Sequence, residues 1–428
     1  MREELLQFIW RYQYFDQHEL VTETGEKVEV LSPGRLNTNQ GPDFLDAQAR
    51  IGGVWLAGSI ELHIVASDWI RHAHDADVHY RNVILHVVWE NDWATPAIPT
   101  LVLRHRVAGS LLGQYGKWMK NDSFVPCERQ LSRVDIGVWP GWNRQLLLQR
   151  LRRRTEVIGT FLDQNRQHWE ETAWWWLARS FGLPVNSTAF EVIGRSLPLR
   201  LLARHRGEVF LLEALLLGQA GMLEGAFQSA YPRLLQKEFL HLRTVYRLPE
   251  IRIPLSFHRM RPGHFPSIRL AQLAVFLSAH PTWFAQLREA EESRHLLSLM
   301  AIVASKYWDY HYRLEVPSLR KPKRLGTVLQ NSLLINAFIP LLFAYGHYRG
   351  ECRAQERAIR WLEGLPPETS AVLRGWSGSG VTCKSAADSQ ALLQLKKEYC
   401  EPKKCLDCAV GQDLLAGKSR PAADSGTG

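Results

Sequence analysis

The stretch Gly41–Val65, GPDFLDAQARIGGVWLAGSIELHIV, decides the fold of the N-terminal part of the chain. Small or apolar residues alternate with polar ones from Leu45 to Ile51 and again from Val54 to Val65, which is the pattern of half-buried strands. Gly52 and Gly53 lie between these two segments and are typical of a two-residue hairpin turn. The sequence therefore predicts two antiparallel strands joined by a tight turn.

The hairpin predicts a register in which one face is apolar throughout. Pairing Ile51 with Val54 sets three further pairs on that face, and a slip by one residue would turn the whole face to solvent. These pairs are Ala49 with Leu56, Ala47 with Gly58, and Leu45 with Ile60. The opposite face then carries Asp46, Gln48, Arg50, Trp55, Ser59, Glu61 and His63.

Segments outside the hairpin complete an α+β prediction. An amphipathic helix is expected over residues 2–16, and strands over 27–31, 83–89 and 98–104. Beyond about residue 135 the periodicity is helical, most clearly over 144–162, 169–181, 208–223, 268–278 and 330–345. We expect a mixed-sheet domain over residues 1–130, a mostly helical domain over 131–415, and a disordered tail over 416–428.

Composition limits the classes of protein to consider. A chain of 428 residues with 46% hydrophobic and 22% charged residues is globular and large enough for two or three domains. The net charge of +9 favours polyanionic partners such as DNA or RNA. No signal peptide and no run of about 18 apolar residues is visible, which predicts a cytoplasmic protein without a membrane span. The oligomeric state is not predicted.

A motif that could carry chemistry surrounds the hairpin. Pro42-Asp43 precedes the first strand, and Glu61-Leu62-His63 lies on the second, where Glu61 and His63 share a face. Two carboxylates in this arrangement can hold Mg²⁺ or Mn²⁺ beside a phosphate.

In motif and element order the first 105 or so residues resemble the PD-(D/E)xK nucleases. The resemblance implies a restriction-endonuclease-like fold for the mixed-sheet domain. It also implies catalytic roles for Asp43, Glu61 and His63, supported by an acid on the preceding helix, Glu4 or Glu3.

The chain departs from the nuclease pattern at two points. His63 stands where a lysine is usual, and imidazole is not a permanent cation at neutral pH. The regular register also places Asp43 opposite Leu62 on the core side, so Asp43 reaches Glu61 only if the strand bulges near Phe44. Asp46 is then the alternative ligand. Without a bulge, Asp43 belongs to a turn and Glu61 is an ordinary solvated strand residue.

Histidines are dense just after the hairpin. His72, His74, His79 and His86 follow His63 within a short span. Imidazole suits Zn²⁺ and other transition metals, so His72, His74 and Asp77 form an alternative metal site. A loop that contacts substrate beside the carboxylates is a further interpretation, and surface or core histidines are another.

A second resemblance spans nearly the whole chain. Several motifs are similar to those of a bacterial family described only as a domain of unknown function, which implies a shared fold and no particular activity. They are Gly41–Phe44, Gly58–His63, Ser67–Trp69, Asn82–Val88, Arg261–Pro266, Asp388–Gln390, Tyr399–Cys400 and Lys404–Gly411.

Three cysteines near the C-terminus form C-x4-C-x2-C: Cys400, Cys405 and Cys408. Closely spaced thiols in a reducing compartment suggest Zn²⁺ or an iron–sulfur cluster, and both usually need a fourth ligand. We expect Cys127, with Cys383 as the second choice and Cys352 as the third, because the resembling family has a cysteine at the position of Cys127. Free buried thiols are the alternative.

Basic runs provide candidate contacts to a phosphate backbone. Arg152, Arg153 and Arg154 form one run, next to Arg150, and Lys321, Lys323 and Arg324 form another. Arg259, Arg261 and His264 form a third basic loop. Solvated surface charge is the alternative for each.

Together these features predict a metal-dependent nucleic-acid phosphodiesterase or a degenerate relative of one. A non-catalytic nucleic-acid-binding or scaffold protein is the first alternative, and a metal hydrolase using the histidine-rich segment is the second.

Overall fold

The chain divides into two compact units. The computed structural model describes all residues except 94–97, 259 and 418–428. The N-terminal unit contains residues 1–142, 378–381 and the stretch that begins at Leu395, and the helical unit contains residues 143–377 and 382–394.

This division differs from the expected one. The cysteine-rich segment belongs to the N-terminal unit, although it follows nearly 250 residues of helical unit. The part of the predicted tail from residue 418 onward lies outside the described residues.

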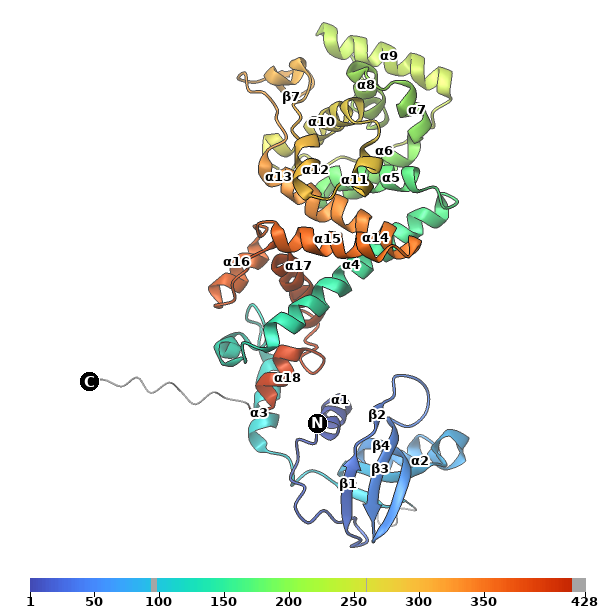
Figure 1. Cartoon of the computed structure of the whole chain (residues 1–428), viewed down its shortest axis with the longest axis vertical. Coiled ribbons are helices and arrows are strands. Elements are labelled where there is room, and N and C mark those ends of the chain that lie inside the picture. The colour runs from blue at the N-terminus through green and yellow to red at the C-terminus, as the bar shows by residue number, and fades with distance from the viewer. Residues whose placement is uncertain (94–97, 259, 418–428) are drawn as a thin grey trace, which may run out of the picture. The chain divides into compact units, whose positions relative to one another are not determined.

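A curled mixed sheet forms the base of the N-terminal unit (Figure 1). Its strand order is β1-β3-β4-β5-β6, and β2 pairs with β3. The β1–β3 and β3–β4 pairs are antiparallel, whereas β4–β5 and β5–β6 are parallel. The strands are β1 Val28–Ser32, β2 Arg35–Leu36, β3 Phe44–Ile51, β4 Val54–Val65, β5 Val83–Glu90 and β6 Thr100–Val102. The predicted single sheet over residues 27–104 is therefore confirmed.

The hairpin has the predicted turn and most of the predicted register. Ile51 pairs with Val54, Ala49 with Leu56 and Ala47 with Gly58. The expected pairing of Leu45 with Ile60 is wrong, because Phe44 takes that place and the register shifts between Phe44 and Ala47.

The register shift is a β-bulge at Asp46. Asp46 has a φ of 61°, so two residues of β3 oppose one of β4. The bulge turns Phe44 fully into the core, where it buries more apolar surface than the half-buried Leu45.

Helical segments pack against β4 in the N-terminal unit. Helix α1, Glu3–Arg11, contacts β4 and buries Leu5, Leu6, Phe8, Ile9 and Trp10. It ends earlier than the predicted residue 16, since Gln13 takes a left-handed conformation with a φ of 54°.

Parallel β4 and β5 need a crossover, which is made of α2 Asp68–Arg71, η1 His74–Ala76 and η2 Val78–Tyr80. This crossover holds the histidine-rich segment against the sheet.

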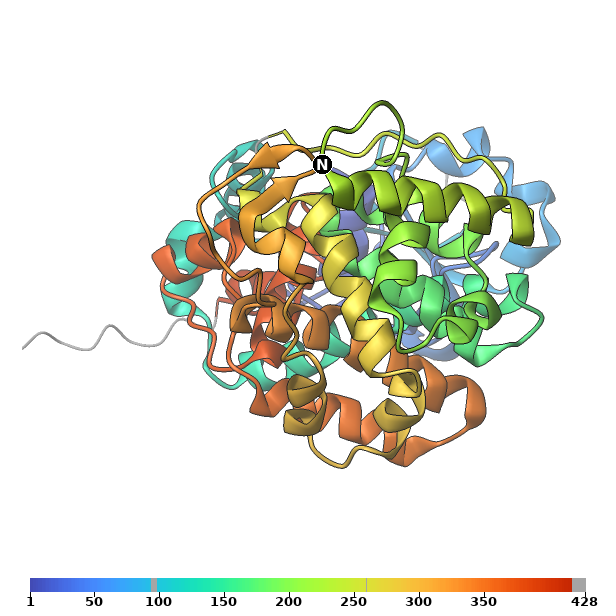
Figure 2. The same ribbon diagram turned by 90° about the horizontal axis from the view of Figure 1, so that it is seen from above.

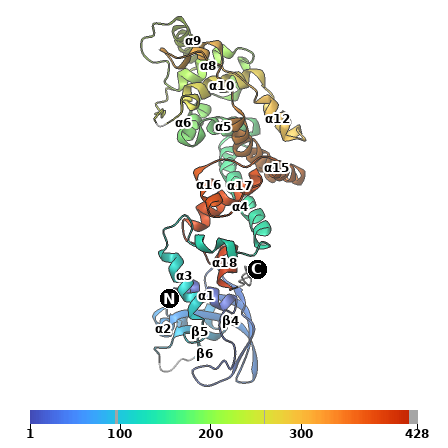
Figure 3. The same cartoon turned by 90° about the vertical axis from the view of Figure 1, so that its left-hand side faces the viewer.

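The rest of the N-terminal unit is helical (Figure 3). Helix α18 contacts α3 and η3, which ties the end of the chain to the segment that follows the sheet. These elements are α3 Gly109–Lys120, η3 Glu128–Arg133, η7 Lys396–Cys400 and α18 Ala409–Leu415. Helix α4, Val138–Gln164, begins in this unit and continues into the other.

The helical unit is built around one apolar core. Figures 1 and 2 show the helices of this unit. Helix α10 packs on α8 and α5, and α8 also packs on α9. Its elements after α4 are α5 Trp169–Phe181, α6 Leu183–Ser196, α7 Leu199–Arg204, α8 Val209–Gln219, α9 Ala230–Tyr246, η4 Pro262–His264, α10 Pro266–Ala279, α11 Trp283–Glu289, α12 Ser293–Leu299, η5 Lys306–Tyr310, β7 His311–Arg313, β8 Val316–Pro317, α13 Thr327–Leu333, η6 Leu334–Phe338, α14 Ile339–Arg349, α15 Cys352–Gly364, α16 Ala371–Gly378 and α17 Ala386–Leu395. The helices predicted from periodicity are confirmed.

The continuous segment Thr327–Arg349 is long and apolar enough to cross a membrane by length and composition. However, 67% of its most apolar window is buried inside the unit, as in the core helix of a globular protein. The segment contains a π-turn, η6, just before Pro340, which has no N–H to donate to the helix.

Candidate metal site

The predicted polar motif lies at the centre of the sheet. Glu61 and His63 point from the same face of β4, and only 5% and 1% of their surfaces are exposed. The crossover covers them with Trp69 and His74, and β5 adds His86, which is paired in register with Glu61. Four ionisable side chains are thus buried together, so their hydrogen bonds and charges must be satisfied by one another or by a bound ion.

The bulge brings Asp43 beside Glu61. The backbone N–H of Asp43 donates to Oε2 of Glu61 at 3.0 Å, and the N–H of Leu62 donates to Oδ2 of Asp43 at 3.1 Å. Gln7 on α1 donates to the other oxygen of Asp43 at 2.9 Å. The structure therefore places the two carboxyl groups of the predicted motif side by side, with their outer oxygens held by backbone amides.

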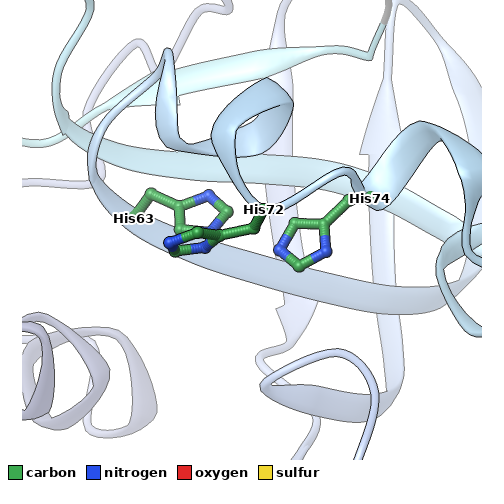
Figure 4. Close-up of side chains that lie close together, drawn as sticks. All are labelled: His63, His72 and His74. Atoms are coloured by element: carbon green, nitrogen blue, oxygen red, sulfur yellow. The ribbon is translucent and has the colours of Figure 1, made fainter.

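Three imidazole rings, those of His63, His72 and His74, lie close together (Figure 4), and two of them face the remaining oxygen of Glu61. Nε2 of His63 lies 3.5 Å from Oε1 of Glu61, and Nε2 of His74 lies 3.4 Å from the same atom. Nδ1 of His72 lies 3.2 Å from Nε2 of His63. The ligand atoms of these three histidines all lie within 4.8 Å of one another, so one ion could contact them together.

Burial sets the protonation of this cluster. Burial and the neighbouring Asp43 raise the pKa of Glu61 to about 9, and burial and Glu3 raise the pKa of Asp43 to about 7. Burial and the other imidazoles lower the pKa of His63 to about 3. Near neutral pH His63 is therefore neutral and offers a lone pair, while Glu61 holds a proton that a cation could replace.

His74 is the clearest sign of a missing partner. Its Nε2 is buried and makes no hydrogen bond within the described part of the chain. The ring is fixed by stacking on Tyr80, with 3.8 Å between ring centroids. A buried nitrogen with no partner costs about 1–3 kcal/mol, which a metal bond would offset.

His63 is oriented from its other side. Nδ1 of His63 shares a hydrogen bond of 2.9 Å with Nε2 of His86, whose own pKa is lowered to about 4 by burial. This leaves Nε2 of His63 facing Glu61 and His72. Partners behind a ligating histidine orient it in this way in many metal sites.

The structure separates residues that the sequence could not distinguish. Glu3, rather than Glu4, is coupled to Asp43 and Glu61 through charge, and partial burial raises its pKa. Glu4 lines a separate cavity of about 350 Å³ with Arg2, Arg11 and Lys403.

Two aspartates proposed as ligands also lie elsewhere. Asp46 is exposed and 3.8 Å from Arg35. Asp77 caps η2 and bonds to the backbone and ring of His79.

The spacing fits a small divalent ion. Four ligands at about 2.1 Å from a tetrahedral ion are about 3.4 Å apart. The separations of 3.2 Å between His72 and His63, and of 3.4 and 3.5 Å from Glu61 to His74 and His63, agree with this value. Imidazole nitrogens favour zinc and other transition metals, whereas Mg²⁺ prefers oxygen ligands. The donor set therefore fits a transition metal better than the Mg²⁺ expected from the carboxylates alone.

Some predicted nucleic-acid contacts have structural roles inside the helical unit. Arg154 donates to the carbonyl of Ile335 at 3.2 Å and to Oδ1 of Asn336 at 2.6 Å, so it satisfies the π-turn before Pro340. Arg153 donates to Gln394, and Arg152 is exposed. Lys323 is 5% exposed and donates to two backbone carbonyls. Arg154 and Lys323 are thus committed to the fold.

Two predicted basic loops meet at one cavity of about 720 Å³ in the helical unit. Buried Arg269 lies in its wall with an unpartnered Nε atom. Basic residues that line the cavity are Arg261, His264, Arg269, Lys321, Lys323 and Arg324. Arg259 of the same loop lies outside the described residues.

The fold and the site define an α+β protein with a buried cluster of histidines and carboxyl groups at the centre of a mixed sheet. The chain belongs to the family described as "Protein of unknown function (DUF2851)", whose model matches residues 3–371. Neither curated proteins nor solved structures gave a significant match. The matched range includes the whole candidate metal site and Cys127, and it ends before the C-terminal cysteines.

Proposed function

We propose that this protein is a metal-dependent phosphodiesterase that acts on nucleic acid, with a transition-metal ion bound by Glu61, His63, His72 and His74. The observation that carries the proposal is the group of three imidazoles whose ligand atoms lie within 4.8 Å of one another, with Glu61 facing two of them and Asp43 beside Glu61. Buried carboxyl groups and neutral imidazoles at these distances form a ligand set for a divalent ion.

The arrangement around the site supports phosphodiester chemistry. An acidic residue comes from α1, an aspartate precedes β3, a Glu-x-His pair lies on β4, and a helical crossover leads to parallel β5. This is similar to the order of elements and acidic residues in the PD-(D/E)xK nucleases. The similarity covers the N-terminal unit up to about residue 105.

The histidine in place of lysine changes which group can supply positive charge beside the phosphate. A lysine would supply a positive charge beside the phosphate, but neutral His63 cannot, because its pKa is lowered to about 3. A bound metal would supply that charge and lower the pKa of a bound water. His63 then contributes a ligand nitrogen, and Asp43 and Glu3 remain to orient a water at the rim.

Access to the site agrees with this assignment. His72 and Glu3 are exposed, whereas Glu61, His63 and His74 are buried beneath them. A phosphate would approach from the side of His72 and Glu3. We also propose that the protein is soluble and cytoplasmic, where a nucleic-acid substrate would be reached.

A hydrolase for a small substrate is the second candidate. The deep burial of Glu61 and His63 favours it, since a narrow site excludes a long polymer more easily than a small molecule. In that case the metal ligands would be the same and the substrate would differ.

The decisive test is cleavage of labelled nucleic acid. Protein stripped with a chelator is supplied with Mn²⁺, Zn²⁺ or Mg²⁺ and incubated with single- and double-stranded DNA and RNA. Glu61→Gln is the test variant, and Glu29→Gln is its matched control, because Glu29 is exposed on β1 of the same sheet.

We expect cleavage that requires Mn²⁺ or Zn²⁺, falls at least about 100-fold in Glu61→Gln, and is unchanged in Glu29→Gln. Equal cleavage by the two variants would assign the activity to a contaminant and overturn the proposal. Metal binding without cleavage of any nucleic acid would favour the small-substrate hydrolase or a non-catalytic scaffold.

A further inference from the structure

Four cysteines gather at a second place in the N-terminal unit, and the proposed function does not use them. Cys127 precedes η3, Cys400 ends η7, and Cys408 immediately precedes α18, with Cys405 in the turn between. Cys127, Cys405 and Cys408 are 8%, 6% and 7% exposed, and all four are free thiols. Three of the four thiols are thus buried, and none of the four forms a disulfide.

The segments that carry the thiols are in contact. Helix α18, which follows Cys408, contacts η3, which follows Cys127. Backbone hydrogen bonds from Lys403 to Cys400 at 3.2 Å and from Cys408 to Cys405 at 3.4 Å fold the other thiols into two successive turns. Cysteine thiolates gathered in this way are the ligands of zinc sites and iron–sulfur clusters.

Hydrogen-bond donors surround the sulfur of Cys408. The backbone N–H groups of Val410 and Gly411 point to it. The indole N–H of Trp142, which is 6% exposed, points to it as well. Donors of this kind stabilise sulfur that carries negative charge.

Positive charge and tight backbone packing complete the site. Lys403, two residues before Cys405, donates to the carbonyl of Met119 on α3 at 2.8 Å. A Cβ atom on Gly411 would lie 2.1 Å from the carbonyl oxygen of Cys405. The start of α18 can therefore pack this closely on the turn that carries Cys405 only with glycine at position 411. The turn that carries Cys405 and Cys408 is therefore fixed against the rest of the unit.

The spacing of the sulfurs discriminates between two cofactors. Four sulfurs on one Zn²⁺ at about 2.3 Å are about 3.8 Å apart. In the described parts of the chain, only His63, His72 and His74 form a group of three or more ligand side chains within 4.8 Å. No three of the sulfurs meet that limit, so the four thiols surround a larger space than a single zinc ion fills. A four-iron cluster spreads its cysteines further, because each sulfur binds a different iron.

We propose that Cys127, Cys400, Cys405 and Cys408 bind a four-iron, four-sulfur cluster that fastens the C-terminal segment to the N-terminal unit. Cys127 is the fourth ligand. Cys383 belongs to the helical unit, and its neighbours are Ser389 and Asp388 rather than other thiols. Cys352 is exposed. The cluster is independent of the histidine site.

The test is composition and spectroscopy of the full chain purified without oxygen. We expect about four iron and four acid-labile sulfide per chain, a brown visible chromophore, and a paramagnetic signal after reduction with dithionite. About one zinc per chain without sulfide would overturn the cluster, and a protein free of both metals would overturn the whole site.

Variants test the ligand set. Cys127→Ser and Cys405→Ser should lose most of the iron and sulfide, whereas the matched control Cys383→Ser should keep both. Retention of the cluster in Cys127→Ser together with its loss in Cys383→Ser would overturn the assignment of Cys127. Where a variant does not fold, the wild-type iron, sulfide and paramagnetic signal still decide the cofactor. Glu61→Gln should keep the cluster, so failure of the proposed phosphodiesterase would leave this result unchanged.

Discussion

Replacing Glu61 with glutamine should have opposite effects with and without metal. In chelated protein at neutral pH the carboxyl group is largely protonated, because burial and Asp43 raise its pKa to about 9. Glutamine has nearly the same shape, and its amide oxygen can still accept the N–H of Asp43, which now donates to Oε2 at 3.0 Å. We therefore expect the free energy of unfolding of the metal-free protein at pH 7 to change by less than about 1 kcal/mol.

With saturating metal, the same substitution should be costly. Loss of one ligand of the four that converge is expected to weaken binding by about 100-fold or more. At a metal concentration of about 100 times the wild-type dissociation constant, the ion stabilises the wild type by about 2.7 kcal/mol. A variant with 100-fold weaker binding would keep only about 0.4 kcal/mol of that stabilisation.

The free energy of unfolding of the metal-free protein should fall as pH rises. A carboxyl group whose folded pKa lies above its unfolded value stabilises the fold below the unfolded pKa, near 4.5, and that stabilisation is lost as pH rises toward the folded pKa, about 9. Each such group contributes at most about 1.4 kcal/mol per pH unit between these limits. The wild type should therefore lose stability from pH 5 to 8, and Glu61→Gln should lose less, since only Asp43 remains.

The assay is urea unfolding followed by tryptophan fluorescence, with chelator and with Zn²⁺ or Mn²⁺, at pH 5, 7 and 8. Glu29→Gln serves as the control and should follow the wild type throughout. The reasoning is refuted if Glu61→Gln keeps the full metal-induced stabilisation, or if it destabilises the chelated protein by several kcal/mol, as removal of the partner of a buried charge would.

Three further outcomes follow from the described contacts. Arg154→Met should lower the free energy of unfolding, measured by thermal melts, by about 2–4 kcal/mol, because the carbonyl of Ile335 and the side chain of Asn336 lose a hydrogen-bond donor. The control Arg152→Met should change it by less than about 0.5 kcal/mol. Neutralising Lys321 and Arg324 together should lower the log–log salt slope of single-stranded DNA binding by about 1.4, measured by fluorescence anisotropy, and an unchanged slope would remove the cavity from the binding surface. Asp46→Val should be less stable than Asp46→Gly by about 1–2 kcal/mol, since valine is strained at a φ of 61°; equal melting temperatures would contradict the bulge.

Local sequence patterns were sufficient for the elements of the fold. Alternating residues on both sides of Gly52-Gly53 determined the hairpin and most of its register, because strand periodicity and the turn both depend on neighbours along the chain. The same alternation placed Glu61 and His63 on one face of β4. Helical periodicity likewise located the main helices of the helical unit, such as α5 over Trp169–Phe181.

The tertiary structure decided which residues form the site. The bulge at Asp46 follows from burying Phe44, a gain that no local pattern measures, and it alone moves Asp43 to the side of Glu61. The phase and end of α1 select Glu3 over Glu4. The crossover folds His72 and His74 onto β4, so that both lie beside His63, and His74 also lies beside Glu61.

Distance along the chain explains why the sequence predicts the elements of the fold but not which residues meet in the site. Secondary structure is set by interactions among residues a few positions apart, whereas burial, pKa and metal-ligand geometry are set by groups brought together from different elements. Arg154 is indistinguishable from Arg152 in the sequence, and only the packing of the π-turn against α4 makes it a buried structural donor. Cys127 lies 273 residues before Cys400, and only the return of the C-terminal segment to the N-terminal unit brings the two thiols together.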